Sequence, residues 1–131
     1  MSKNLELLKK YNFEKQLKRL NNSLRCKSIL IYGTGLFFKT IKENYDLSNL
    51  NIIGISDKRY KPYQEGQEEL GYKIIPYDKI IEYKPDCILI ATLNTYAIYQ
   101  TFNNKKIKDA KIKVLPLVEK PFFELLKEAL G

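Results

Sequence analysis

Two glycines around one threonine carry the clearest chemical signal in this chain of 131 residues. Gly33 and Gly35 flank Thr34 directly after the apolar run 29–32, and a helical pattern begins at once. Glycine permits a tight turn and lets the backbone approach a phosphate with no side chain between them. The free N–H groups and the positive dipole end of the following helix then face the anion. The sequence therefore predicts a phosphate-binding turn between this strand and this helix.

Asp57 gives a second, independent signal at the end of the next strand pattern. It lies 22 residues after Gly35 and follows the apolar run 51–56. An acidic side chain about 20 residues beyond the glycines, at the tip of the second strand, is the usual acceptor for ribose hydroxyls. The spacing therefore predicts that Asp57 binds the ribose of a nucleotide. Lys58 begins a basic stretch that can pair with a terminal phosphate or form a solvated loop.

Phe38 departs from the full dinucleotide pattern G-x-G-x-x-G, because it occupies the place of the third glycine. A phenylalanine there is expected to hold the helix away from the strand or to redirect the turn, and so to crowd a full dinucleotide. This favours a smaller ligand, or a vestigial site, over tight NAD binding. The alternative without any ligand is that Gly33 and Gly35 only make a sharp turn.

The elements that must position these residues alternate between strand and helix patterns, which predicts an α/β fold with a mostly parallel sheet covered on both faces. Five short apolar runs indicate buried strands, at 28–32, 51–56, 73–75, 87–91 and 111–115. Helical patterns follow the first strand and begin again at Pro76, at Asn94 or Thr95, and at Pro121. The non-periodic segment 57–72 is expected to be a surface loop.

Further polar residues follow the fourth strand pattern. Thr92 and Asn94 should meet the glycine turn at the carboxyl edge of the sheet, where ligands collect in open α/β folds. Their side chains can donate hydrogen bonds to a sugar or base and accept them in return. Helix capping explains Asn94 equally well.

The first 26 residues predict a helical arm in two phases. Leu5 and Leu8 share one face, and a second stripe is formed by Phe13, Leu17, Leu20 and Leu24. A bend is expected near Asn12, which can cap the second helix. The arm can pack on its own sheet or contact another chain, as a homodimer or beside a partner enzyme. The expected division is an arm at 1–26 and an α/β domain at 27–131, forming one domain overall.

The composition narrows the classes of function. Histidine is absent, so the commonest general base, the commonest zinc ligand and any Ser-His or Cys-His pair are missing. No metal site and no catalytic residue is identified. The formal charge of +8 favours anionic partners. The lysine-rich run 105–113 is interpreted as a solvated loop and strand entrance, and without a DNA- or RNA-binding signature nucleic acid is not expected as a partner.

The cysteines and the apolar runs bear on localisation. Cys26 and Cys87 lie far apart, and no disulfide is expected between them. The first residues lack the apolar core of a signal peptide, and no apolar run approaches the roughly 20 residues needed to span a bilayer. A cytoplasmic protein with no membrane span is expected.

Four stretches of the chain resemble a known group of domains, namely 31–35 (IYGTG), 51–57 (NIIGISD), 71–76 (GYKIIP) and 84–92 (KPDCILIAT). Over roughly residues 27 to 118 the chain resembles the small Rossmann-like sugar-nucleotide-binding domains of bacterial polysaccharide and surface-glycan biosynthesis. Relatives occur in the N-terminal part of sugar acetyltransferases and the C-terminal part of sugar C-methyltransferases. The resemblance implies a Rossmann-like three-layer α/β/α fold. It also implies nucleotide or nucleotide-sugar binding by Gly33, Thr34, Gly35, Asp57, Ala91 and Thr92.

The expected function is therefore a nucleotide or nucleotide-sugar binding domain of bacterial surface-glycan biosynthesis that is not catalytic alone. NAD is the less favoured ligand. Two alternatives stay open: a small NAD(P)-dependent enzyme or redox-sensing domain, and an interaction module with a vestigial nucleotide site. The candidate binding residues are Gly33, Thr34, Gly35, Asp57, Lys58, Ala91, Thr92 and Asn94.

Overall fold

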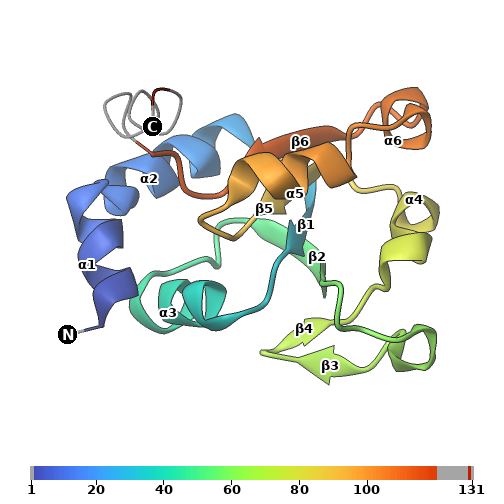
Figure 1. The fold of residues 1–131 in the computed structure, drawn as a ribbon, viewed down its shortest axis with the longest axis horizontal. Helices are drawn as coiled ribbons and strands as arrows, with labels where there is room; N and C mark the ends of the chain where they lie inside the picture. Colours follow the sequence, from blue (N-terminus) through green and yellow to red (C-terminus); the bar gives the residue numbers. More distant parts are fainter. Residues whose placement is uncertain (1, 121–129, 131) are drawn as a thin grey trace.

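A parallel sheet of four strands forms the centre of the molecule (Figure 1). The computed structural model describes residues 2–120 and residue 130. The strands are β1 (Ser28–Tyr32), β2 (Asn51–Ser56), β5 (Cys87–Ile90) and β6 (Lys113–Pro116), in the spatial order β2-β1-β5-β6. Every pairing between them is parallel, which confirms the expected fold class.

The expected strand at 73–75 is reduced to a single parallel bridge between Ile55 and Ile74. The residues before it form β4 (Tyr72–Lys73), which pairs antiparallel with β3 (Glu68–Glu69). Pro76 has no N–H to continue a ladder, so pairing with β2 ends after Ile75 donates to the Ile55 carbonyl (2.8 Å). The sheet edge beyond β2 is therefore a short hairpin in the segment where a loop was predicted.

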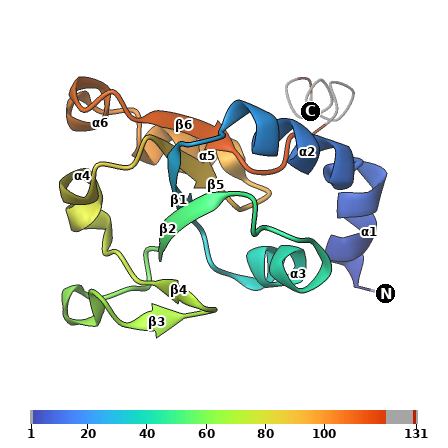
Figure 2. The ribbon, with the colours of Figure 1, turned by 180° about the vertical axis from the view of Figure 1, so that it is seen from behind.

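Helices cover both faces of the sheet (Figures 1 and 2). One face carries α1 (Lys3–Lys10), α2 (Phe13–Ser23) and α3 (Leu36–Asn44). The other carries the short 3₁₀ helix η2 (Tyr77–Lys79) with α4 (Ile80–Tyr83), α5 (Thr95–Thr101) and α6 (Lys105–Asp109). Alternate side chains of a strand point to opposite faces. Accordingly Ile29 and Ile31 lie in the core cluster of the first face, and Leu30 and Tyr32 in that of the second.

The helix α6 is a departure from the sequence-based interpretation, which made its lysine-rich segment a loop. Asn104 caps it, because its Oδ1 accepts the Ile107 N–H at 3.0 Å. Ile107 is buried against the second face, whereas the lysines around it are exposed. One buried isoleucine and one cap thus fix a helix too short for periodicity to reveal.

The N-terminal arm packs on its own sheet. Leu8, Phe13 and Leu17 are buried in the same cluster as Ile29 and Ile31. The expected bend occurs at Asn12, which has a left-handed backbone (φ 55°) but makes no capping hydrogen bond through its side chain.

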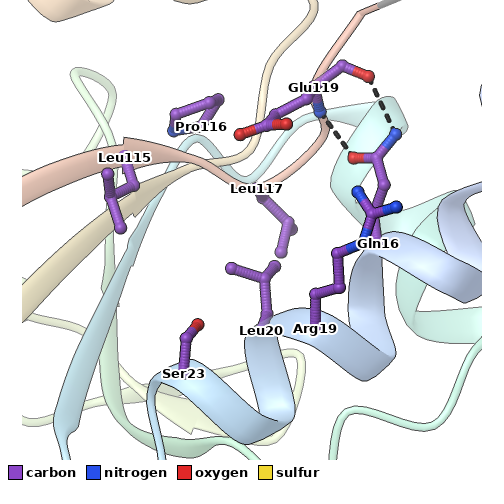
Figure 3. A pocket seen from close by; sticks show the side chains of 8 residues that line it. All are labelled: Gln16, Arg19, Leu20, Ser23, Leu115, Pro116, Leu117 and Glu119. Atoms are coloured by element: carbon purple, nitrogen blue, oxygen red, sulfur yellow. Dashed lines mark hydrogen bonds between the residues drawn. The ribbon is translucent and has the colours of Figure 1, made fainter.

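A pair of hydrogen bonds ties α2 to the chain after β6, at a groove between the two elements (Figure 3). Gln16 Nε2 donates to the Glu119 carbonyl at 2.8 Å, and the Glu119 N–H donates to Gln16 Oε1 at 2.7 Å. Among the residues described, no helix has the length and apolar character needed to cross a membrane. The helix expected from Pro121 lies outside the described residues.

Candidate functional site

The glycine turn joins β1 to α3, and its two glycines have different structural roles. Gly33 has φ +104°, and a Cβ atom there would lie 2.6 Å from Thr92 Cγ2. Its backbone is therefore fixed by the turn and by close contact with the end of β5. Gly35 precedes α3 with an extended backbone, and no atom of the described residues lies within 4 Å of a Cβ placed on it. The space beside the first turn of α3 is open, as a phosphate subsite requires.

Thr34, between the glycines, is joined to Asp57 at the tip of β2. The Thr34 N–H donates to Asp57 Oδ2 at 2.7 Å, and Thr34 Oγ1 donates to the same oxygen at 3.2 Å. The Gly33 N–H donates to the Ser56 carbonyl at 2.9 Å, so the turn is bonded to the end of β2 at two successive residues. Asp57 Oδ1 accepts only a long contact from the Arg59 N–H (3.3 Å) among the described residues. One carboxylate oxygen thus holds the turn, while the other retains capacity for a ligand hydroxyl.

Arg59 adds a cation to this cluster. Its Nη2 atom donates to Thr34 Oγ1 at 3.0 Å and to Glu69 Oε1 at 2.8 Å. Its guanidinium also lies over the ring of Tyr60, 4.6 Å from the ring centroid. Tyr60 in turn donates its hydroxyl to Thr34 Oγ1 at 3.0 Å. The segment after β2 is therefore folded back on the glycine turn.

Titration of these groups depends on their contacts. The hydrogen bond between Arg59 and Glu69 raises the pKa of the guanidinium and lowers the pKa of the carboxyl. Burial is the main cause that raises the pKa of Tyr60. Burial, then the charge of Asp57, raises the pKa of Tyr32 at the end of β1. At neutral pH the cluster therefore contains an ion pair and neutral phenols.

Two hydroxyl groups at the carboxyl edge have no hydrogen-bond partner within the described part of the chain. They are Ser56 Oγ at the end of β2 and Thr92 Oγ1 after β5, and both atoms are buried. Buried hydroxyls normally find a partner, so each such group calls for an explanation. Both residues adjoin Gly33, through the Ser56 carbonyl and the Thr92 methyl. A ligand or water beside the turn would satisfy them.

The remaining candidates divide into two groups. Ala91 is buried beside the turn, where its N–H donates to the Tyr32 carbonyl (2.8 Å) and extends the β1–β5 pairing. Asn94 is exposed and precedes α5 without a capping hydrogen bond from its side chain. Lys58 points to solvent and has no hydrogen bond or ion pair with any described residue. Gly33, Thr34, Gly35, Asp57, Ala91 and Thr92 gather at one edge, whereas Lys58 and Asn94 lie at its rim.

Phe38 does not obstruct this edge. Its side chain is fully buried in the core of the first face, with its ring 6.4 Å from that of Tyr72. The crowding predicted for this position is not observed at Gly35, where the space is open. The sequence placed Arg59 in the basic stretch that can pair with a phosphate, but it gave no role to Tyr60 or Glu69. Only the hairpin at 68–73 brings Glu69 to the turn.

Cys87 is buried in β5, and burial raises the pKa of its thiol to about 11. It is a packed apolar side chain and not a nucleophile. Both cysteines are free thiols. Within the described residues, no cluster of acidic and cysteine side chains could hold a metal ion.

Comparison with known proteins gives a family and a fold. The family described as C2185-like, N-terminal matches residues 25–113. No curated protein matches the chain. One similar solved structure is the repressor RSP in complex with β-NADH, with a TM-score of 0.50 and 17% identity over 88% of this chain. Another is RSP in complex with β-NAD⁺ and operator DNA, with a TM-score of 0.48 and 19% identity over 89% of this chain.

These structures bear on the fold alone at such identities. RSP is described as a Rex-family repressor. This chain spans 66% of the length of RSP in both complexes, just under two thirds. The Rossmann-like fold is thereby supported, and neither RSP nor the family description refers to glycan biosynthesis.

One expectation is wrong. Nucleic acid was excluded as a partner for lack of a binding signature, but a protein of similar fold has been solved with operator DNA. Contacts to the phosphate backbone need only suitably placed lysines and arginines, and no motif records them. The lack of a binding motif is therefore no reason to exclude nucleic acid as a partner of a chain whose formal charge is +8.

Proposed function

We propose that this chain, which belongs to the C2185-like, N-terminal family, is a redox-sensing domain. It binds a dinucleotide of the NAD(H) class at the carboxyl edge of its sheet. The ligand diphosphate lies at the first turn of α3 beside Gly35, and Asp57 accepts the hydroxyls of the adjoining ribose. The observation that carries the proposal is the 2.7 Å bond from the Thr34 N–H to Asp57. This hydrogen bond joins the glycine turn to Asp57, the two features that the sequence predicted separately.

The choice of a full dinucleotide rests on the position of Phe38. The argument for a smaller ligand was that this ring would crowd the turn, but the ring is buried in the core. The open space beside Gly35 therefore removes the objection to a diphosphate. The complex of RSP with β-NADH, a protein of the same fold, adds support for this ligand class.

The division into an arm at 1–26 and a binding domain at 27–131 is part of the proposal. Leu8 and Phe13 share a core with β1, so the arm contributes to the stability of the domain. The arm is expected to be necessary for folding, and its removal exposes apolar surface on α3 and the sheet.

A thermal-shift panel tests the proposal with NADH, NAD⁺, NADPH, ADP-ribose and UDP-glucose. A ligand at 100 times its Kd adds about 2.7 kcal/mol of stability, enough to raise Tm by several degrees. NADH and ADP-ribose should both stabilise the protein, because both present an adenosine diphosphate whose ribose hydroxyls are free. NADPH should act more weakly, since Asp57 repels its 2′-phosphate. A shift with UDP-glucose alone would favour the nucleotide-sugar function, and no shift with any ligand would favour a vestigial site.

A further inference from the structure

A groove on the second face of the sheet lies apart from the glycine turn. It runs between η2–α4 and the α5–α6 connection and has a volume of about 450 Å³. That volume lies within the range of small-molecule pockets, roughly 300 to 1,000 Å³. Aromatic, aliphatic and basic side chains line it, among them Tyr77, Ile80, Phe102, Lys105, Lys106 and Ile107. None of them belongs to the proposed dinucleotide site.

The apolar part of the groove is held in place before any ligand arrives. Ile80, Phe102 and Ile107 are buried in the core cluster of the second face. Phe102 also packs edge-on against Tyr32, with ring centroids 4.9 Å apart. The Tyr77 ring lies 5.6 Å from that of Phe102, and its hydroxyl donates to the Thr101 carbonyl at 3.0 Å. Such a fixed aromatic wall lowers the entropy cost of binding a flat apolar body.

The side chains at the rim of the groove carry a net positive charge. Lys105 and Lys106 are exposed, and neither forms an ion pair with a described residue. Asp78 is the single acid among the lining residues. Asn104 is already engaged, since its Oδ1 accepts the Ile107 N–H and its Nδ2 donates to the Thr101 carbonyl. The two ammonium groups are the cationic hydrogen-bond donors at the rim.

We propose that this groove binds a small organic anion with an aromatic body, its ring against Tyr77 and Phe102 and its anionic group at Lys105 and Lys106. The occupant is a carboxylate or sulfonate of about the size of two or three fused or linked rings, because the groove volume suits a single small molecule. The two lysines supply the charge complementarity, and the aromatic wall supplies most of the apolar contact.

Titration with 8-anilinonaphthalene-1-sulfonate tests the proposal, because this probe is an aromatic anion whose fluorescence rises in an apolar site. The variant Lys105→Gln/Lys106→Gln removes the rim charges, and Lys108→Gln/Lys111→Gln is the matched control. The control removes the same net charge from neighbouring exposed positions that do not line the groove. The first variant should weaken probe binding about tenfold, and the control should change it less than about twofold.

A neutral probe and an apolar variant complete the test. N-phenyl-1-naphthylamine lacks the sulfonate, so its affinity should be nearly the same in both double variants. Ile81→Asp, at a half-buried position of the wall, should weaken both probes. Equal loss of sulfonate binding in the two lysine variants would overturn the proposal, as would the lack of any saturable binding by the wild-type chain. None of these readouts depends on NADH, so they can fail independently of the dinucleotide proposal.

Discussion

The same set of hydrogen bonds occurs at both ends of β1, at the carboxyl edge and at the amino edge of the parallel sheet, but in different surroundings. At the carboxyl edge, the backbone N–H and hydroxyl of Thr34 both donate to Asp57 Oδ2, at 2.7 and 3.2 Å. At the amino edge, the backbone N–H and hydroxyl of Ser28 both donate to Asp86 Oδ2, at 2.8 and 3.2 Å. We call these pairs the carboxyl-edge clasp and the amino-edge clasp. Each joins the end of β1 to the neighbouring strand.

The two clasps differ in the groups that lie beside them. The amino-edge clasp closes on itself, since the Asp86 N–H donates back to Ser28 Oγ at 2.9 Å, and Asp86 is exposed to solvent. The carboxyl-edge clasp adjoins the open space at Gly35 and the Thr92 hydroxyl, which has no hydrogen-bond partner among the residues that the structure describes. The comparison teaches that the hydrogen bonds of a clasp stabilise a strand end, whereas the space and the helix N-terminus beside it make a binding site.

The largest expected effect tests the open space. Gly35→Leu should weaken NADH binding about 50-fold, because the side chain fills the position of the diphosphate. Its unfolding free energy should fall by no more than about 1 kcal/mol, since the backbone there suits any residue and no described residue lies within 4 Å of the new Cβ, while leucine is a poorer helix N-cap than glycine. Gly35→Ala, a smaller step, should cause an intermediate loss. Isothermal titration and urea unfolding measure the two effects, and unchanged affinity in the leucine variant would remove the ligand from this turn.

The next largest effect concerns Gly33, whose substitution should lower the stability of the protein. Gly33→Ala should destabilise the protein by about 2 kcal/mol, because alanine is strained at φ +104° and its Cβ meets Thr92 Cγ2. Adding Thr92→Ser removes the colliding methyl and should recover part of the loss. Urea denaturation of both variants gives the values. Full stability of Gly33→Ala would mean that the turn can move to accept a side chain.

A smaller effect compares the clasps directly. Asp57→Asn should weaken NADH binding about tenfold, because the amide accepts ribose hydroxyls less well than the carboxylate does. Asp86→Asn, the matched change at the amino edge, should leave the affinity within about twofold of the wild type. Calorimetric titration of the two variants with NADH measures both affinities. Equal losses in the two variants would show that the clasps act only through the stability of β1.

The smallest effect is a pH dependence shared by both regions. The hydrogen bond from Arg59 lowers the pKa of Glu69, and the two from Ser28 lower the pKa of Asp86. A carboxyl whose folded pKa is depressed adds stability above its unfolded pKa, about 4, and loses it as the pH falls through the folded value. Glu69→Gln and Asp86→Asn should each flatten the fall in stability between neutral pH and pH 3. The control Glu68→Gln should keep the wild-type profile, which urea midpoints measured across this range will reveal.

Local patterns were enough to predict the four strands of the parallel sheet and the glycine turn, but not that the fifth expected strand, at 73–75, would be reduced to a single bridge. Buried strands such as β1 and β5 appear as continuous apolar runs, and glycine marks the turn by its backbone freedom. The spacing from Gly35 to Asp57 also placed the carboxylate at the correct edge. These features depend on residues within one strand–helix–strand unit, where sequence distance and spatial distance agree.

The rest depends on contacts that no local pattern records. β3 and β4 have two residues each, so no alternation reveals the hairpin that brings Glu69 to Arg59. Phe38 fits because the core has room for its ring, which a comparison with the glycine pattern alone cannot show. Which residues lie in the groove at Lys105 and Lys106 likewise depends on α4 and α6 meeting across the second face.

The most direct test of the dinucleotide site is an NMR titration of protein labelled with ¹⁵N in glycine alone. The chain has six glycines, so each amide signal can be followed separately. NADH should shift the signals of Gly33 and Gly35 in a saturable manner and leave that of Gly66, in the segment before β3, in place. Saturable shifts of Gly66 without any change at Gly33 and Gly35 would contradict the account, as would a spectrum that NADH leaves unchanged.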